Sequence, residues 1–183
     1  MTSRHALSRP LFAILAGLAV AGCATAPETQ AERTDLKAEA ERALKQMKSQ
    51  DPTFDEFLGR SAGYVVFPRI GKGGFIFGGG YGRGVVYESG ATIGYADITQ
   101  ATVGFQIGGQ AFTQVLVFET ARDVQRFKSG RLALTANASA VIVKTGAAAA
   151  TRYTDGVAVF VRPIGGAMAE AAVGGQQFSF VPE

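Results

Sequence analysis

Glycines are spread through a long stretch of residues that otherwise favour β-strands, and this feature limits the fold more than any other. The chain has 24 glycines in 183 residues, and most of them follow residue 60, among valine, phenylalanine, tyrosine and threonine. A glycine inside a strand typically marks a bulge, a sharp bend or a close approach of two backbones. The pattern therefore predicts a strongly curved sheet, barrel-like or a sandwich. A glycine-rich low-complexity tail is the alternative, and the interleaved large apolar residues disfavour it.

Strand-like composition recurs along this region, separated by turn residues. The segment Glu88–Gly90 predicts a tight turn, since its glycine can adopt a positive φ. The predicted strands cover residues 63–67, 73–81, 84–87, 92–97, 102–109, 112–118, 132–143 and 156–162.

Helical periodicity is confined to three places. Apolar residues at 3.6-residue spacing predict a helix over 35–50, which begins at the capping residue Asp35 and is broken by Pro52. A short helix is expected over 53–58, and Thr120 with its capping partner three residues later predicts another that ends before Gly130. The fold class predicted is α+β, with helices at the ends of a mostly antiparallel sheet.

The N-terminus has the layout of an exported protein. Basic residues precede a short apolar run, as in a secretory signal peptide. The run has about half the length that a membrane-spanning helix needs. The run ends in 20–23, Val-Ala-Gly-Cys, which resembles the lipobox of bacterial lipoproteins. We expect a signal peptide over 1–22, a diacylglycerol or acyl anchor on Cys23, a flexible tether over 23–34 and a single domain over 35–183. An ordinary signal peptidase site near Cys23 is the alternative.

The compartment follows from the same residues by resemblance to known lipoprotein sorting. Ala24 stands where an aspartate is associated with retention in the inner membrane, so we expect the protein at the periplasmic face of the outer membrane. Cys23 is the only cysteine, which excludes an intramolecular disulfide.

The charge pattern is more informative than the charge total. The net charge of +3 falls to +1 once Arg4 and Arg9 leave with the signal peptide, which gives no support for nucleic-acid binding. Residues 60–162, however, carry 11 basic and 5 acidic side chains, a local excess of six positive charges. Basic groups beside aromatic residues suit an anionic membrane surface, although such charges can equally well solvate the outer face of a sheet.

Catalytic and cofactor motifs are not found. His5 is the only histidine and precedes Cys23, so the mature chain has no imidazole for a metal or for general-base catalysis. Residues 71–84 do not have the glycine spacing of a dinucleotide or phosphate loop. We therefore expect no cofactor, no metal and no catalytic residue. Carboxylates that could still meet in space, as in a hydrolase, are Asp97, Glu119, Asp123 and Asp155.

An ordered series of motifs resembles the SYLF domain. The resemblance spans roughly residues 36–180, and the series is more specific than any one of its pieces. It consists of 63–68 (GYVVFP), 70–75 (IGKGGF), 78–85 (GGGYGRGV), 105–110 (FQIGGQ), 116–118 (LVF) and 157–160 (VAVF).

The resemblance implies binding of acidic phospholipids, which SYLF domains of eukaryotic proteins perform, and it adds no catalytic residue. Lys72 matches the lysine of the family motif, and Arg69 and Arg83 flank it. These three residues are the predicted headgroup site. A structural envelope protein that recognises another protein through a sheet edge remains the alternative function.

Overall fold

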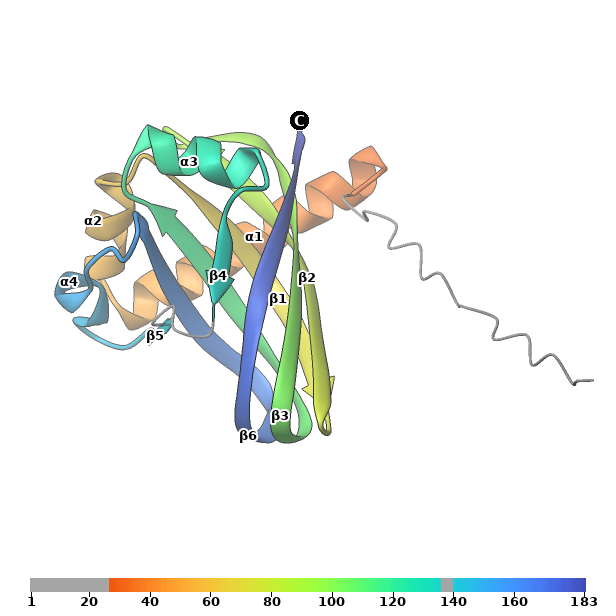
Figure 1. Ribbon diagram of the computed structural model, residues 1–183. Helices are drawn as coiled ribbons and strands as arrows, with labels where there is room; N and C mark the ends of the chain where they lie inside the picture. The colour runs from red at the N-terminus through yellow and green to blue at the C-terminus, as the bar shows by residue number, and fades with distance from the viewer. Residues whose placement is uncertain (1–26, 136–139) are drawn as a thin grey trace, which may run out of the picture.

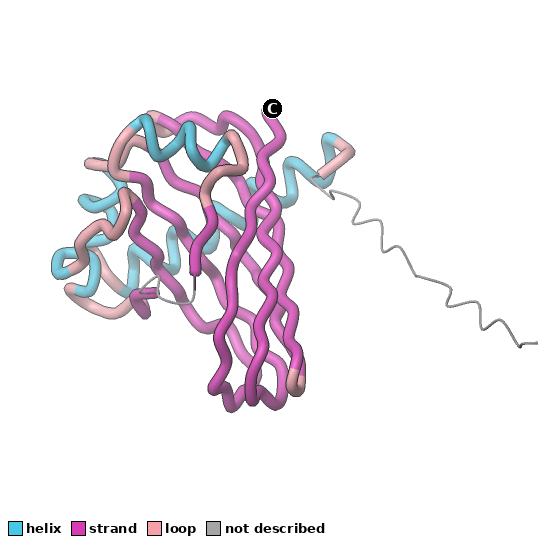
Figure 2. The backbone as a smooth tube through the Cα atoms, in the orientation of Figure 1, coloured by secondary structure: helices cyan, strands magenta, loops and turns pink. Residues whose placement is uncertain are grey.

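The computed structural model describes residues 27–135 and 140–183, where four helices accompany one curled sheet (Figures 1 and 2). The predictions for residues 1–26, including the signal peptide and Cys23, lie outside the described residues. The helices are α1 (Gln30–Gln50), α2 (Thr53–Gly59), α3 (Ala121–Lys128) and α4 (Ala147–Ala150). The strands are β1 (Gly63–Gly74), β2 (Phe77–Glu88), β3 (Ala91–Phe118), β4 (Ala133–Thr135), β5 (Ala140–Ile142) and β6 (Val157–Pro182).

The two longest strands fold back on themselves. Residues 91–103 of β3 pair with β2, whereas residues 108–118 pair with β1, so β3 bends around the tip of the β1–β2 hairpin. β6 follows the whole of β3 in antiparallel register and bends with it. The three turns therefore lie at the same end of the molecule, as Figure 2 shows.

Counting both legs of β3 and of β6, the sheet has eight strand segments. Their order is β5, first leg of β6, second leg of β3, β1, β2, first leg of β3, second leg of β6, and β4. Among the strands that the structure describes, β5 alone pairs in parallel. The sheet is a strongly curled half-barrel, which confirms the predicted α+β class with a curved, mostly antiparallel sheet.

The two faces of the sheet carry separate cores. On the outer face, α1 and α2 pack their buried side chains, such as Met47 and Phe54, against strand residues that include Phe160. On the concave face, Val124 and Phe127 of α3 join a second core. Side chains of non-neighbouring strands meet across this concave face, since the Phe67 and Phe178 rings are 6.1 Å apart.

Glycine is required where a side chain crosses the concave face. A Cβ on Gly84 would lie 2.7 Å from the Phe67 ring, closer than real contacts allow. The absence of a side chain on β2 therefore lets Phe67 pack flat against the sheet, which is one physical reason for the glycine-rich pattern.

Several boundaries differ from the sequence predictions. The first helix begins at Gln30, five residues before Asp35, because Thr29 and Glu32 form a capping box at its start. Residues 30–34 are therefore helical, and the predicted tether is wrong for them. The capping box at Thr120 and the helix after it are confirmed.

The strand predictions failed mainly at the turns. The predicted strand over 73–81 is interrupted by a turn at residues 75 and 76. The predicted strand over 132–143 is two short strands that pair with different legs of β6, and part of it lies outside the described residues. The last strand does not end at Arg162 but continues to Pro182. The tight turn is confirmed, with positive φ at both Ser89 and Gly90.

Candidate functional site

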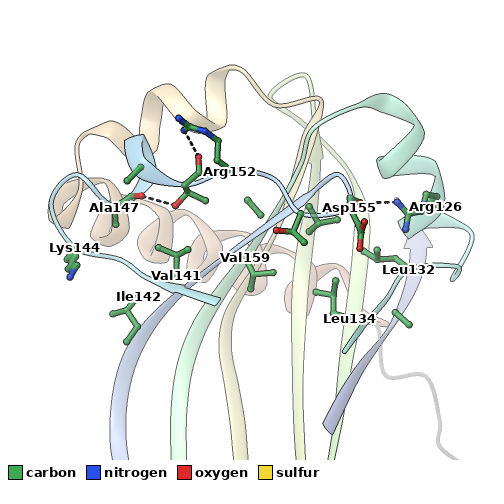
Figure 3. A pocket seen from close by; sticks show the side chains of 16 residues that line it. Arg126, Leu132, Leu134, Val141, Ile142, Lys144, Ala147, Arg152, Asp155 and Val159 are labelled. Carbon is green, nitrogen blue, oxygen red and sulfur yellow. Dashed lines mark hydrogen bonds between the residues drawn. The ribbon is translucent and has the colours of Figure 1, made fainter. Parts of the chain in front are cut away.

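A cavity of about 700 Å³ lies at the open side of the curled sheet, where β4 and β5 form its two edges (Figure 3). Its volume falls in the range of about 300–1,000 Å³ typical of small-molecule sites. We call it the edge groove. Apolar side chains from β4, β5 and the start of β6 line most of it, namely Leu132, Leu134, Val141, Ile142, Val157 and Val159.

Three cationic side chains lie around the margin of the edge groove. Figure 3 shows Arg126, Lys144 and Arg152 at the periphery of the apolar side chains. Lys144 and Arg152 are exposed, and neither forms an ion pair with any residue in the described ranges 27–135 and 140–183. An apolar interior with cationic groups at its margin suits an amphipathic anion.

The third cation is held in place by its neighbours. Nη1 of Arg126 donates to Oδ1 of Asp123 at 3.1 Å and to the carbonyl oxygen of Asp155 at 3.0 Å. Burial would raise the pKa of Asp123, but hydrogen bonds from Thr120 and Arg126 outweigh it and hold that pKa below its usual value. Arg126 is therefore a fixed part of the margin, whereas Lys144 is exposed and the exposed Arg152 donates from Nη1 to the carbonyl oxygen of Thr151 at 3.3 Å.

One buried carboxylate fixes the α4 wall of the groove. Asp51 accepts hydrogen bonds from the backbone N–H groups of Gly146 at 3.1 Å and Ala148 at 2.8 Å, and from both the N–H and the hydroxyl of Thr53. Burial would raise the pKa of Asp51, yet these hydrogen bonds outweigh it and lower that pKa. Asp51 thus ties α4, which carries groove residue Ala147, to the start of α2.

The structure brings together only two of the three predicted headgroup residues. Arg69 and Arg83 are directly opposite each other on β1 and β2, on the outer face, where Arg83 lies 3.9 Å from Glu32 of α1. Ile70 belongs to the concave core, and Lys72 lies two residues further along the same strand. Lys72 therefore faces the concave side of the sheet, opposite to Arg69 and Arg83. The three do not converge on one surface, and none of them lines the edge groove.

Two of the four carboxylates considered for catalysis have structural partners. Asp97 accepts hydrogen bonds from the hydroxyls of Tyr81 and Ser179 on the outer face, while Asp123 caps α3. Within the described residues, no group of His, Cys, Asp or Glu has the arrangement of a metal site. No described helix is both long and apolar enough to span a membrane.

A known family model matches the C-terminal part of the chain. Residues 99–179 match the family described as Ysc84, Las17-binding protein actin regulator. This match agrees with the SYLF resemblance of the motif series in the sequence. The SYLF match contains β4, β5, α4 and all three margin cations of the edge groove, whereas Arg69, Lys72 and Arg83 precede it. Comparison with curated proteins finds no match.

Sequence reasoning missed the edge groove. The local excess of positive charge includes Arg126, Lys144 and Arg152, but the resemblance pointed only to the cations nearest the glycine motif. The groove depends on β4 and β5 pairing with different legs of β6, which no local sequence signal reports.

Proposed function

We propose that the protein is a membrane-anchored lipoprotein whose SYLF domain binds acidic phospholipid in the edge groove. The observation that carries this proposal is the apolar cavity of about 700 Å³ with cationic side chains at its margin. The SYLF resemblance of the sequence implies the same ligand class independently of the geometry, and the match of residues 99–179 is consistent with that resemblance.

The groove offers each part of a phospholipid a suitable environment. Acyl methylene groups would leave water against Val141, Ile142 and Val159, at about 0.8 kcal/mol for each buried methylene. The phosphate would lie at the margin, near Lys144 and Arg152. Because both cations are exposed, each contact with the phosphate is expected to contribute no more than about 1 kcal/mol. The proposal includes no catalytic step.

The proposed anchor on Cys23 changes how strong this binding needs to be. A domain held at the periplasmic face of the outer membrane meets lipid at a high effective concentration, so a weak site in dilute solution is sufficient in place. The alternative, a scaffolding role through protein recognition, is supported by the uncovered edge of β6 beyond β5.

Vesicle co-sedimentation tests the proposal. The chain from residue 24 onward keeps every described helix and strand and lacks the lipid, so any binding reports the domain itself. We expect recovery with vesicles containing phosphatidylglycerol and much less with phosphatidylcholine alone. Equal recovery with both would overturn the proposal of acidic phospholipid binding, and a single dominant protein crosslinked in intact cells would favour the scaffolding role.

A charge-matched pair of variants locates the site. Replacing Lys144 and Arg152 together by glutamine should reduce binding to the anionic vesicles. The control replaces Lys45 and Arg131, two exposed cations that do not line the groove, and should leave binding close to wild type. Equal losses in both pairs would mean that general charge, and not the groove, determines the binding.

A further inference from the structure

The end of the sheet at which β1–β2, β3 and β6 turn exposes large apolar side chains. Phe75 is 58% exposed, Ile76 54% and Phe77 74%, all at the β1–β2 turn. Val103 and Ile107 at the β3 bend are 58% and 46% exposed, and Val103 is the register partner of Phe77. We call these five residues the apolar end. Figures 1 and 2 show the turns of these strands together, opposite to α3.

Charge is sparse near the turns of the apolar end, where the nearest cation in the sequence is Lys72 of β1. Residues 73–82 and 98–118 contain no Asp, Glu, Lys or Arg, and residues 163–182 contain only Glu170. The register places Glu170 opposite Gln106, next to Ile107 in the β3–β6 bend, so one acidic residue lies at this end, across β3 from the β1–β2 turn. A surface this poor in charge avoids the large desolvation penalty that ions suffer in hydrocarbon.

The backbone at the apolar end is largely paired. Between Val103 and Gly108 the β3 bend stays in register with residues 173–168 of β6. The N–H of Phe75 donates to the carbonyl of Phe77 within the β1–β2 turn, at 3.3 Å. Polar backbone groups that are already hydrogen-bonded do not need water, which is the condition for placing backbone in a bilayer.

The position of the expected anchor agrees with contact between this end and the same membrane. Glu32, in the first turn of α1, lies 3.9 Å from Arg83, and Arg83 is six residues, or about 20 Å, from Phe77 along β2. The seven residues from Cys23 to Thr29 can reach at most about 24 Å. The reach of this segment is of the same order as the distance from Arg83 to Phe77, which agrees with a lipid on Cys23 and the apolar end in one bilayer.

We propose that the apolar end, Phe75, Ile76, Phe77, Val103 and Ile107, inserts into the interfacial region of a lipid bilayer. This inference rests on the proposed lipid-binding function and adds the orientation of the domain: β1 and β2 stand on the membrane by their turn, and α3 points away from it. The edge groove then lies above the bilayer on the same β6 strand that bends at its surface.

Single tryptophans test the orientation, because the chain has none of its own. Phe77→Trp places one at the apolar end, and the matched control Gln125→Trp places one on the exposed face of α3 at the opposite end. With anionic vesicles whose acyl chains are brominated, we expect a blue shift and strong quenching for Phe77→Trp and neither change for Gln125→Trp. Vesicle binding with no quenching of Phe77→Trp would overturn the orientation and leave the proposed function intact. Absence of vesicle binding would contradict both.

The double variant Phe75→Ser and Phe77→Ser tests the energetic contribution. Both side chains are exposed, so folding should be unaffected, and a far-ultraviolet circular dichroism melt provides that control. We expect the vesicle partition coefficient to fall by about tenfold or more, given the transfer free energy of two phenylalanines. An unchanged coefficient would overturn the proposal. A wild-type dimer in light scattering that the double variant abolishes would also overturn it, since the apolar end would then be an interface between two copies.

Discussion

Replacing Asp51 by alanine should destabilise the protein by about 3 to 4 kcal/mol. The Asp51 carboxylate accepts four hydrogen bonds, and the one from the N–H of Ala148 is buried at 2.8 Å. A hydrogen bond to a charged group contributes about 1.5–3 kcal/mol, and a buried donor left without a partner costs about 1–3 kcal/mol. We assign about 2 kcal/mol to the Ala148 bond and a similar total to the other three, whose donors can regain water.

Chemical denaturation followed by circular dichroism measures this loss, and thermal melts should show a midpoint about 10 °C lower, at about 2–4 °C per kcal/mol for a chain of this size. Asp35→Ala, on the exposed face of α1, is the control and should stay within about 0.5 kcal/mol of wild type. If Asp51→Ala also stays within that range, the hydrogen bonds to α4 do not carry the stability assigned to them.

The same carboxylate predicts a pH dependence. Because the folded pKa of Asp51 is lowered, its contribution is fully present above the unfolded value of about 3.9 and is lost as the pH falls through the folded pKa. Wild type should therefore lose free energy of unfolding below about pH 4 more steeply than Asp51→Asn. Identical slopes for the two proteins would refute this assignment.

Three further predictions each concern a single residue. Gly84→Ala should cost about 1–3 kcal/mol in the free energy of unfolding, because the new Cβ meets the Phe67 ring, whereas Gly59→Ala, with open space around it, should have little effect. Asp123→Ala should remove the α3 capping box and cost about 1–2 kcal/mol by denaturation, and an unchanged midpoint would count against the cap. Cys23→Ser should move the protein out of the membrane fraction in cell fractionation, and full retention there would contradict lipid anchoring.

The sequence predicted the type of fold from its glycine pattern, and the structure gives the physical reason. Gly84 leaves room for Phe67, and the turn at Ser89 and Gly90 uses positive φ at both positions. The positive-φ turn is a local requirement that a single sequence displays, whereas the contact of Gly84 with Phe67 joins two strands. Thr29 and Glu32 have the spacing of a capping box and so indicate a helix start at Gln30. The polar composition around them favoured a tether instead.

The bends and the site depended on pairing between distant segments. Nothing local distinguishes the turn at residues 75 and 76 from the strands around it, because the same apolar and glycine residues continue through it. The edge groove combines β4, β5 and β6, and its α4 wall is set by Asp51, 97 residues before Ala148. The odd spacing of Arg69 and Lys72 places them on opposite faces once both are known to lie in β1, but the predicted strands 63–67 and 73–81 left them out.

The central claim is that an acidic phospholipid occupies the edge groove. Its most direct test is nuclear magnetic resonance of the domain titrated with dihexanoyl phosphatidylglycerol below its micelle concentration. We predict that the methyl signals of Val141, Ile142 and Val159 shift together and saturate, and that dihexanoyl phosphatidylcholine shifts them much less. Methyl signals that stay unchanged, or that respond equally to both lipids, would contradict the claim.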